Sequence, residues 1–313
     1  MEWTVSTDEQ GLRLDKFLAG PERLGSRRRA SVALDRGKVF LNAVEAPKDA
    51  AATRLAAGDL VRVWMDRPGS ARGRVARRSR DLRIVYEDDA LMVLDKPAGL
   101  LAVPLERRGG APSIYDQVLE HLRPHGKRRP FVVHRIDRDT SGLVVFAKDA
   151  VAQGRLKGQF KRHVVERVYQ AVVYGRPEPP AGTWRDRLVW DQRALIQKET
   201  HPRDPNGMDA VSHYRVLEPF GAASLIEVRL ETGKRNQIRI QARLRGHTLV
   251  GERRYVYGPD ELRPIQFERQ ALHAYRLAFE HPMSGELLRF EAPIPPDFDD
   301  LLTRLRSQAS SQK

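Results

Sequence analysis

The chain of 313 residues contains no cysteine. This absence excludes disulfide bonds, thiolate catalysis and cysteine-ligated zinc sites, and it is compatible with the cytoplasm, the location we predict. Two of the nine histidines, His121 and His125, have the spacing of helical metal ligands, but Pro124 lies between them. Because proline breaks the helix that would align the two rings, we expect no metal site there.

Long apolar runs are also missing, so no segment reads as a membrane span. The first residues, Met1-Glu2-Trp3-Thr4, are polar and do not resemble a signal peptide. No amphipathic basic helix stands out, and we therefore expect no membrane partner. A glycine-rich phosphate loop, the signature of many nucleotide cofactor sites, is absent as well.

What the chain has in excess is positive charge. Its net charge is +14 and its isoelectric point is about 10.3, which favours a polyanionic partner. Seven arginines and one acid fall within residues 67–83, together with proline and glycine. This composition predicts a flexible basic linker, either a solvated spacer or, as we favour, a contact for nucleic-acid phosphates.

The order of apolar runs predicts an α+β chain rather than regular βαβ units. We expect strands at 84–86, 91–94, 168–174 and 224–231, a helix that begins at Ser113, a second helix over 150–160, and a late hairpin around 283–285. The predicted organisation is a small domain over 1–66, the linker over 67–81, a larger domain over 82–300, and a disordered Ser/Gln-rich tail over 301–313.

The most informative segment is His134-Arg135-Ile136-Asp137-Arg138-Asp139-Thr140-Ser141-Gly142. Apolar runs at 131–133 and 143–146 flank it, so we expect Asp137 in a tight turn between two buried strands. A turn with ordinary surface ion pairs is the alternative reading. A kinase catalytic loop is excluded because Ile136 breaks its spacing and no Asp-Phe-Gly segment exists.

Three blocks of sequence together resemble the RluA-type family of RNA pseudouridine synthases, over roughly residues 82–298. The first is Val85-Tyr86-Glu87-Asp88-Asp89 followed by Val93-Leu94-Asp95-Lys96-Pro97-Ala98-Gly99. The second is the segment 134–142, and the third is Leu230-Glu231-Thr232-Gly233-Lys234-Arg235-Asn236-Gln237-Ile238-Arg239 with Gly246-His247, Gly251 and Tyr257-Gly258. Two departures stand out in the third block. Arg235-Asn236 replace the usual Thr-His, and Gln241 stands where histidine is frequent.

Residues 1–66 resemble an S4 RNA-binding domain. The similarity lies in Arg13-Leu14-Asp15-Lys16-Phe17-Leu18, in Ser26-Arg27-Arg28-Arg29, in Gly37-Lys38-Val39-Phe40-Leu41-Asn42 and in Gly58-Asp59-Leu60-Val61-Arg62-Val63. Ala43 occupies a position where glycine is common, which predicts an altered turn.

The resemblance implies a mixed, mainly antiparallel sheet with flanking helices, and the isomerisation of a uridine within RNA, a reaction that needs no cofactor. It implies that Asp137 is the catalytic residue, acting as a nucleophile or as a base on the ribose. Arg239 would keep that carboxylate charged, since burial disfavours an unpaired charge. Tyr169 would stack on the uracil or serve in proton transfer. Arg135 would assist base flipping, and Lys96 and Arg138 would contact the RNA backbone.

For the target, the S4-like segment favours large-subunit ribosomal RNA, with a structured tRNA as the alternative. A non-catalytic RNA-binding or ribosome-assembly factor on the same scaffold is the alternative from another class. We expect a monomer. Four tryptophans, Trp3, Trp64, Trp184 and Trp190, are candidates for stacking on bases, although isolated tryptophans more often belong to the core.

Overall fold

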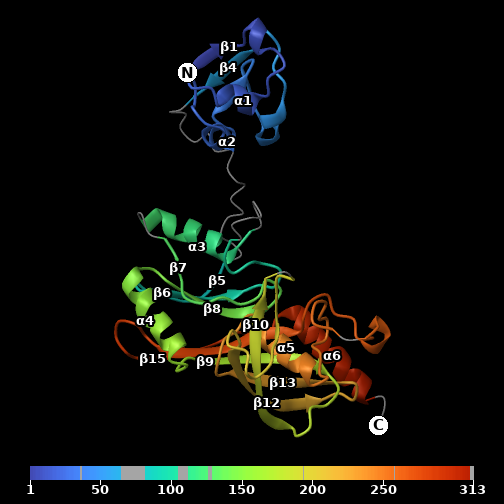
Figure 1. Cartoon of the computed structure of the whole chain (residues 1–313). Coiled ribbons are helices and arrows are strands. Elements are labelled where there is room, and N and C mark those ends of the chain that lie inside the picture. Colours follow the sequence, from blue (N-terminus) through green and yellow to red (C-terminus); the bar gives the residue numbers. More distant parts are fainter. Residues whose placement is uncertain are drawn as a thin grey trace. The chain divides into compact units, whose positions relative to one another are not determined.

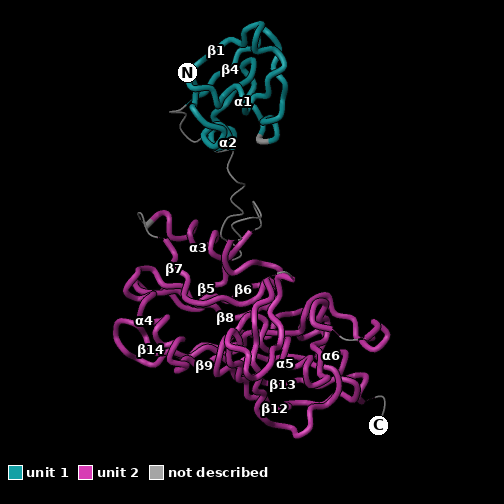
Figure 2. Tube along the Cα trace, in the orientation of Figure 1, with its two compact units in different colours: residues 1–80 teal, residues 81–313 magenta. Residues whose placement is uncertain are grey.

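The computed structural model describes residues 1–35, 37–64, 82–104, 112–125, 129–192, 194–256 and 258–310. The chain divides into two compact units, Met1–Arg80 and Asp81–Lys313, shown in different colours in Figure 2. The predicted basic linker and Tyr257 lie outside the described residues.

The first unit pairs a small sheet with short helices. Its elements are β1 (Glu2–Thr4), η1 (Thr7–Glu9), α1 (Leu14–Leu18), α2 (Arg27–Asp35), β2 (Val39–Leu41), β3 (Val44–Glu45), η2 (Lys48–Ala52) and β4 (Leu60–Val63). The strands are antiparallel in the order β1-β4-β2-β3. Leu14, Phe17 and Leu18 of α1 pack with Leu34 of α2 and Val61 of β4 in one apolar core.

The turn between β2 and β3 explains why glycine would suit position 43. Leu41 pairs with Val44, so Asn42 and Ala43 form a two-residue hairpin turn with φ values of 50° and 65°. Such turns need left-handed backbone at both central residues, a conformation that asparagine tolerates but that costs alanine about 1 kcal/mol. The turn keeps its geometry in spite of Ala43.

The second unit is built on one large sheet. Its strands are β5 (Arg83–Glu87), β6 (Leu91–Lys96), β7 (Phe131–Val132), β8 (Ser141–Ala147), β9 (Glu166–Tyr174), β10 (Ala181–Asp191), β11 (Ile196–Glu199), β12 (Met208–Pro219), β13 (Ala223–Leu230), β14 (Leu272–Glu280) and β15 (Leu287–Glu291). The main order is β11-β10-β12-β13-β9-β14-β8-β6-β5, with β15 beside β14 and β7 beside β8. β14 and β8 pair in parallel, and the other pairings among the described strands are antiparallel.

Helices cover both faces of this sheet (Figure 1). They are α3 (Ile114–Leu122), α4 (Ala150–Lys161), α5 (Gln237–Leu244) and α6 (Pro296–Ser310), with short turns η4 (Arg123–His125) and η5 (Asp260–Leu262). Strand β6 shows the two faces, since Met92 and Leu94 pack in the α3 cluster while Leu91 and Val93 pack in the α4 cluster. This is the period-two alternation of a strand buried on both sides.

The fold class expected from the sequence is confirmed, as are its main elements. β5 and β6 form the expected hairpin, and β14 and β15 form the late one. Ser113 caps α3, accepting a hydrogen bond from the Asp116 backbone N–H at 3.2 Å.

Two local predictions are wrong. The segment 301–313 was expected to be disordered, but α6 continues to Ser310 because Phe298, Leu301, Leu302 and Leu305 bury one face against the sheet. The tight turn at Asp137 is present at the end of the loop 133–140, where the Asp137 carbonyl accepts from the Thr140 backbone N–H at 3.2 Å. The preceding strand β7, however, is half-buried rather than interior. Its pairing partner β8 is buried along its whole length.

Gly142 fixes where this loop ends. It pairs in parallel with Ala274, has a φ of 108°, and leaves no room for a side chain. A Cβ at this position would lie 2.2 Å from the Ala274 carbonyl oxygen. Only glycine permits so close an approach of two backbones. The loop 133–140 therefore enters β8 at a fixed point beside β14.

Among the described residues, no helix is long and apolar enough to cross a bilayer. No cluster of three or more metal-ligating side chains occurs in the same parts of the chain. His121 itself lies within hydrogen-bonding distance of Glu87 at 2.9 Å.

Candidate active site

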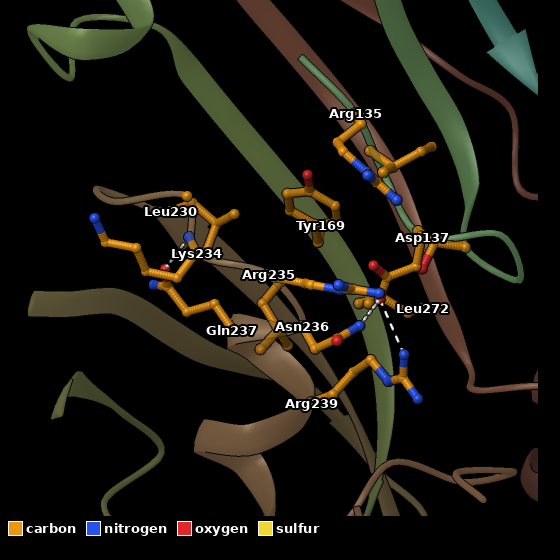
Figure 3. Close-up of a pocket in the computed structure, with 14 residues that line it drawn as sticks. Arg135, Asp137, Tyr169, Leu230, Lys234, Arg235, Asn236, Gln237, Arg239 and Leu272 are labelled. Atoms are coloured by element: carbon orange, nitrogen blue, oxygen red, sulfur yellow. Dashed lines mark hydrogen bonds and ion pairs between the residues drawn. The ribbon is translucent and has the colours of Figure 1, made fainter. Parts of the chain in front are cut away.

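A cavity of about 340 Å³ opens beside the loop 133–140 and the start of α5. Its lining comes from segments far apart in sequence, shown in Figure 3. These residues are Arg135, Ile136, Asp137, Thr140, Tyr169, Leu230, Gly233, Lys234, Arg235, Asn236, Gln237, Ile238, Arg239 and Leu272.

Asp137 and Arg239, separated by about a hundred residues in the chain, meet in this cavity. Nη1 of Arg239 donates to Oδ2 of Asp137 at 3.0 Å. Nδ2 of Asn236 donates to the same oxygen at 2.6 Å. The Arg239 side chain is 11% exposed and that of Asp137 is 24% exposed, so the carboxylate is accessible while its partner is largely covered.

A second carboxylate holds Arg239 from the other side. Nε and Nη2 of Arg239 donate to the two oxygens of Glu252 at 2.6 and 2.7 Å, a bidentate pair. The Glu252 side chain is fully buried and also accepts backbone N–H bonds from Arg253, Arg254 and Tyr255. We refer to Asp137, Arg239 and Glu252 as the cavity floor.

The charges of the floor stabilise one another. Burial alone would lower the pKa of Arg239, but the hydrogen bonds and charge of Glu252, with the charge of Asp137, raise it. Burial alone would raise the pKa of Glu252, but its bonds to Arg239 and to backbone N–H groups lower it. Both groups are therefore ionised at neutral pH, and Arg239 presents a fixed positive charge to Asp137.

Two glutamines fix α5 to the sheet and so position Arg239. Gln241 donates to the carbonyls of Trp184 and Ala210 at 3.2 and 3.0 Å and accepts from Ser212 at 2.6 Å. Gln237, one turn earlier, donates to the Val211 carbonyl at 3.1 Å. Gln241 is fully buried away from the cavity, so its departure from the family pattern affects the anchoring of the helix.

The loop that carries Asp137 is held by two buried basic side chains. Nζ of Lys96 donates to the carbonyls of Arg138, Pro97 and Leu100, each at 2.8 Å. Nη1 of Arg269 donates to the next carbonyl in the loop, that of Asp139, at 3.1 Å. Burial lowers the pKa of Lys96 to about 7, against the opposing charges of Asp139 and Asp137.

This position corrects the expectation for Lys96. Its side chain is 0% exposed and its three hydrogen bonds go to backbone carbonyls, so it has no surface to offer to an RNA backbone. The ammonium group instead shapes the loop that presents Asp137.

Tyr169 and three apolar side chains form a wall of the cavity. Tyr169 comes from β9 and is 9% exposed, and Ile136, Leu230 and Leu272 line the same space. Burial, opposed by the charge of Arg167, raises the pKa of Tyr169, so its hydroxyl stays protonated at neutral pH. In Figure 3 the Tyr169 ring lies on the opposite side of Asp137 from Arg239.

Exposed arginines surround the opening. Arg135 is exposed and lines both the cavity and an adjoining cleft of about 540 Å³. Arg138 is also exposed and pairs with Asp139 at 3.0 Å. We call Arg135 and Arg138 the rim. The cleft is lined by seven arginines, namely Arg135, Arg138, Arg235, Arg239, Arg253, Arg254 and Arg269.

The four tryptophans have different positions. Trp184 is buried and stacks on Tyr214 with ring centroids 4.7 Å apart. Trp190 is half-buried, and the guanidinium of Arg235 lies 4.5 Å above its ring. Trp3 packs against the core of the first unit, and Trp64 is 44% exposed.

Three residues of the site were not anticipated as such from the sequence: Asn236, Glu252 and Tyr255. The hydroxyl of Tyr255 donates to Oδ1 of Asn236 at 3.1 Å, and its ring lies 5.2 Å from the Arg239 guanidinium. Their positions in the sequence could have identified two of them. Glu252 directly follows the motif glycine Gly251, and Asn236 is one of the two residues that depart from the motif.

Comparison with known proteins shows relatives along most of the chain. Residues 90–244 match the model of the RNA pseudouridylate synthase family. An uncharacterized RNA pseudouridine synthase of Bacillus subtilis is 36% identical over 97% of this chain and 97% of its own length. The ribosomal large subunit pseudouridine synthase D of Neisseria meningitidis is 36% identical over 98% of this chain and 82% of its own length.

A solved structure shares the fold. The human RNA pseudouridylate synthase domain containing 4 superposes with a TM-score of 0.59 at 23% identity, covering 72% of this chain and 93% of that one. This likeness concerns the fold alone. The family is shown by the Bacillus and Neisseria relatives, which match nearly the whole chain at 36% identity. The resemblance read from the three sequence blocks is thus confirmed, and the chain belongs to the RNA pseudouridine synthase family.

Proposed function

We propose that this protein converts uridine to pseudouridine in large-subunit ribosomal RNA, with Asp137 as the catalytic residue. One observation carries the proposal: an accessible carboxylate, bonded to the fixed charge of Arg239 at 3.0 Å, lines a cavity of about 340 Å³ with a partly apolar wall. A cavity of this size falls in the range of small-ligand pockets, and its wall suits the flat face of an extruded base.

The adjoining cleft suits the rest of the substrate. Five of its seven arginines are exposed and offer guanidinium groups to phosphates next to an extruded nucleotide, namely Arg135, Arg138, Arg235, Arg253 and Arg254. Arg135 lines both spaces, which is the position required of a side chain that assists base flipping. Arg138 lies farther out, in the cleft and not in the cavity.

The chemistry is an isomerisation that balances without a co-reactant. The bond between N1 of uracil and C1′ of ribose breaks, the base turns, and C5 bonds to C1′. C5 loses one proton and N1 gains one. An ionised Asp137 begins this sequence either by attacking C1′ or by removing a proton from the ribose. Tyr169, with its protonated hydroxyl and its ring in the cavity wall, serves base stacking and proton transfer.

The choice of RNA comes from the relatives. The Neisseria protein and a Zymomonas mobilis relative, 40% identical over 72% of this chain and 73% of its own length, are both named ribosomal large subunit pseudouridine synthase D. The net charge of +14 agrees with a large polyanionic substrate.

The test is conversion of unmodified transcripts by the purified full chain. Large-subunit ribosomal RNA and a pool of tRNA transcripts are incubated with the wild type and with Asp137→Asn, and pseudouridine is mapped at nucleotide resolution. We expect conversion of the ribosomal transcript alone, lowered about 10²- to 10⁴-fold in the variant. Binding of the transcript should be retained.

Each alternative outcome overturns a part of the proposal. Conversion of tRNA alone would refute the ribosomal target. An Asp137→Asn protein that works at the wild-type rate would refute the catalytic assignment. Binding of RNA without conversion by the wild type would indicate the non-catalytic factor.

A further inference from the structure

Asn236 lies between Tyr255 and the reactive carboxylate. Its Nδ2 donates to Oδ2 of Asp137 at 2.6 Å, and its Oδ1 accepts from the Tyr255 hydroxyl at 3.1 Å. Tyr255 is 4% exposed and is held close to the Arg239 guanidinium. The three side chains therefore form one continuous chain of hydrogen bonds from a buried phenol to the cavity.

The orientation of the Asn236 amide follows from its two partners. An ionised carboxylate only accepts hydrogen bonds, so the group that faces Asp137 must be the N–H₂. The amide oxygen is then left facing Tyr255, whose hydroxyl donates to it. The opposite orientation would place the amide oxygen against the carboxylate, two acceptors facing each other, so Asp137 selects the orientation of the amide and the Tyr255 hydroxyl holds its oxygen in place.

The backbone of Asn236 is also suited to this task. It precedes α5 in the left-handed conformation, with a φ of 55° and a ψ of 22°, which asparagine tolerates better than most residues. Asparagine at this place in a helix commonly caps the first turn, but here its side chain makes no capping bond. The amide is turned toward Asp137 instead.

Both donors to Asp137 bind the same oxygen. Arg239 and Asn236 each reach Oδ2, and in the described parts of the chain no hydrogen bond reaches Oδ1. Figure 3 shows these two donors approaching the carboxylate from the α5 side, with Tyr169 and Arg135 across from them. One oxygen is thus fixed and the other is left for the substrate.

We propose that Asn236 is a positioning residue of the reaction: it holds Oδ2 of Asp137 so that Oδ1 meets the nucleoside, and Tyr255 acts through it by fixing its amide. The inference rests on the proposed role of Asp137. It assigns a task to the position where this chain has asparagine in place of the histidine usual in the motif.

The test is a double-mutant cycle on the full chain, with the ribosomal transcript as substrate. Asn236→Leu keeps the size of the side chain but removes both hydrogen bonds. Because a hydrogen bond to a charged group is worth about 1.5–3 kcal/mol, we expect kcat to fall about 10- to 150-fold. KM should stay within about 3-fold, since the bond serves the carboxylate rather than the RNA.

The companion variants locate the effect. Tyr255→Phe removes only the hydroxyl and should lower kcat by about 3- to 10-fold, the value of one neutral hydrogen bond. The double variant should be no slower than Asn236→Leu alone, because Tyr255 acts through Asn236. Asn236→His, which keeps an N–H donor, should retain more activity than Asn236→Leu.

Three results would refute the inference: wild-type kcat in Asn236→Leu, multiplicative losses in the double variant, or a rise in KM with an unchanged kcat. The last result would make Asn236 an RNA contact. Failure of the proposed function is recognised separately, because either the wild type would then convert no transcript or Asp137→Asn would stay active, whatever Asn236 does. Thermal unfolding of each variant verifies that it is folded.

Discussion

The cavity floor and the rim use the same residue type under opposite conditions. In the floor, Arg239 is 11% exposed and is fixed by two carboxylates through three hydrogen bonds. At the rim, Arg135 and Arg138 are exposed. A buried guanidinium that is fully paired acts as a constant charge for its neighbour, whereas an exposed one is available to a phosphate.

The two carboxylates of the floor also differ in burial. Glu252 is fully buried and receives its bonds from Arg239 and from three backbone N–H groups, so it has no free surface for a substrate. Asp137 is 24% exposed and is bonded through one oxygen. Of the two carboxylates beside Arg239, one serves structure and the other is accessible for chemistry.

The largest effect expected is the loss of the Glu252 charge. Glu252→Gln leaves Arg239 buried with only Asp137 as its ionic partner, so we expect the free energy of unfolding to fall by about 3 kcal/mol. Urea unfolding at pH 7 measures it. Arg306→Ala, which breaks an exposed pair with Glu218, is the matched control and should cost less than about 1 kcal/mol. Equal losses in the two variants would contradict the distinction between the floor and the surface.

A second prediction concerns pH and the loop that carries Asp137. His134 accepts a hydrogen bond from the Val145 backbone N–H at 3.1 Å and stacks on Phe160. Burial, with the charge of Arg167, lowers the pKa of His134 to about 3 from 6.5. Between pH 3 and 6.5, His134 is therefore protonated in the unfolded chain but neutral in the folded protein. Because protons then favour the unfolded chain, the free energy of unfolding decreases as the pH falls below about 6.5.

We expect this loss to reach about 2 kcal/mol at pH 5 relative to pH 8. His134→Gln removes the titrating group while keeping an acceptor for Val145, so its stability should fall less over the same range. Urea unfolding of both proteins at pH 8, 6.5 and 5 gives the difference. Parallel curves would show that His134 is not the group responsible.

The smallest expected effect is at the rim. Arg135→Ala should remove the proposed phosphate contact, so the slope of log affinity against log salt should become shallower by about 0.7–0.9. Arg138→Ala should change the slope less, because its guanidinium is already paired with Asp139. Binding of the ribosomal transcript from 50 to 300 mM salt measures both. Arg306, which lines neither the cavity nor the cleft, provides the control.

Local patterns in the sequence predicted the strands and helices whose periodicity is clear, such as β6, α3 and α4. They did not predict β10, β11 and β12. In these strands buried and exposed positions do not alternate regularly, so the sequence lacks a clear period of two. Helix α6 was not predicted for a similar reason. Its composition is polar, but the few apolar residues of α6 share one face, and only the sheet they cover shows that the helix is stable.

By itself, the sequence determined the chemistry available to this protein. The absence of cysteine excluded thiolate chemistry, and the excess of arginine with the motif around Asp137 predicted a carboxylate that acts on a polyanion. The family resemblance pointed to Arg239 as the partner of that carboxylate, but only the tertiary structure brings the two side chains to 3.0 Å and turns Lys96 toward backbone carbonyls instead. Local sequence specifies charge and turn propensity, whereas the distance between Asp137 and Arg239 depends on how β8, β14 and the anchored helix α5 pack together.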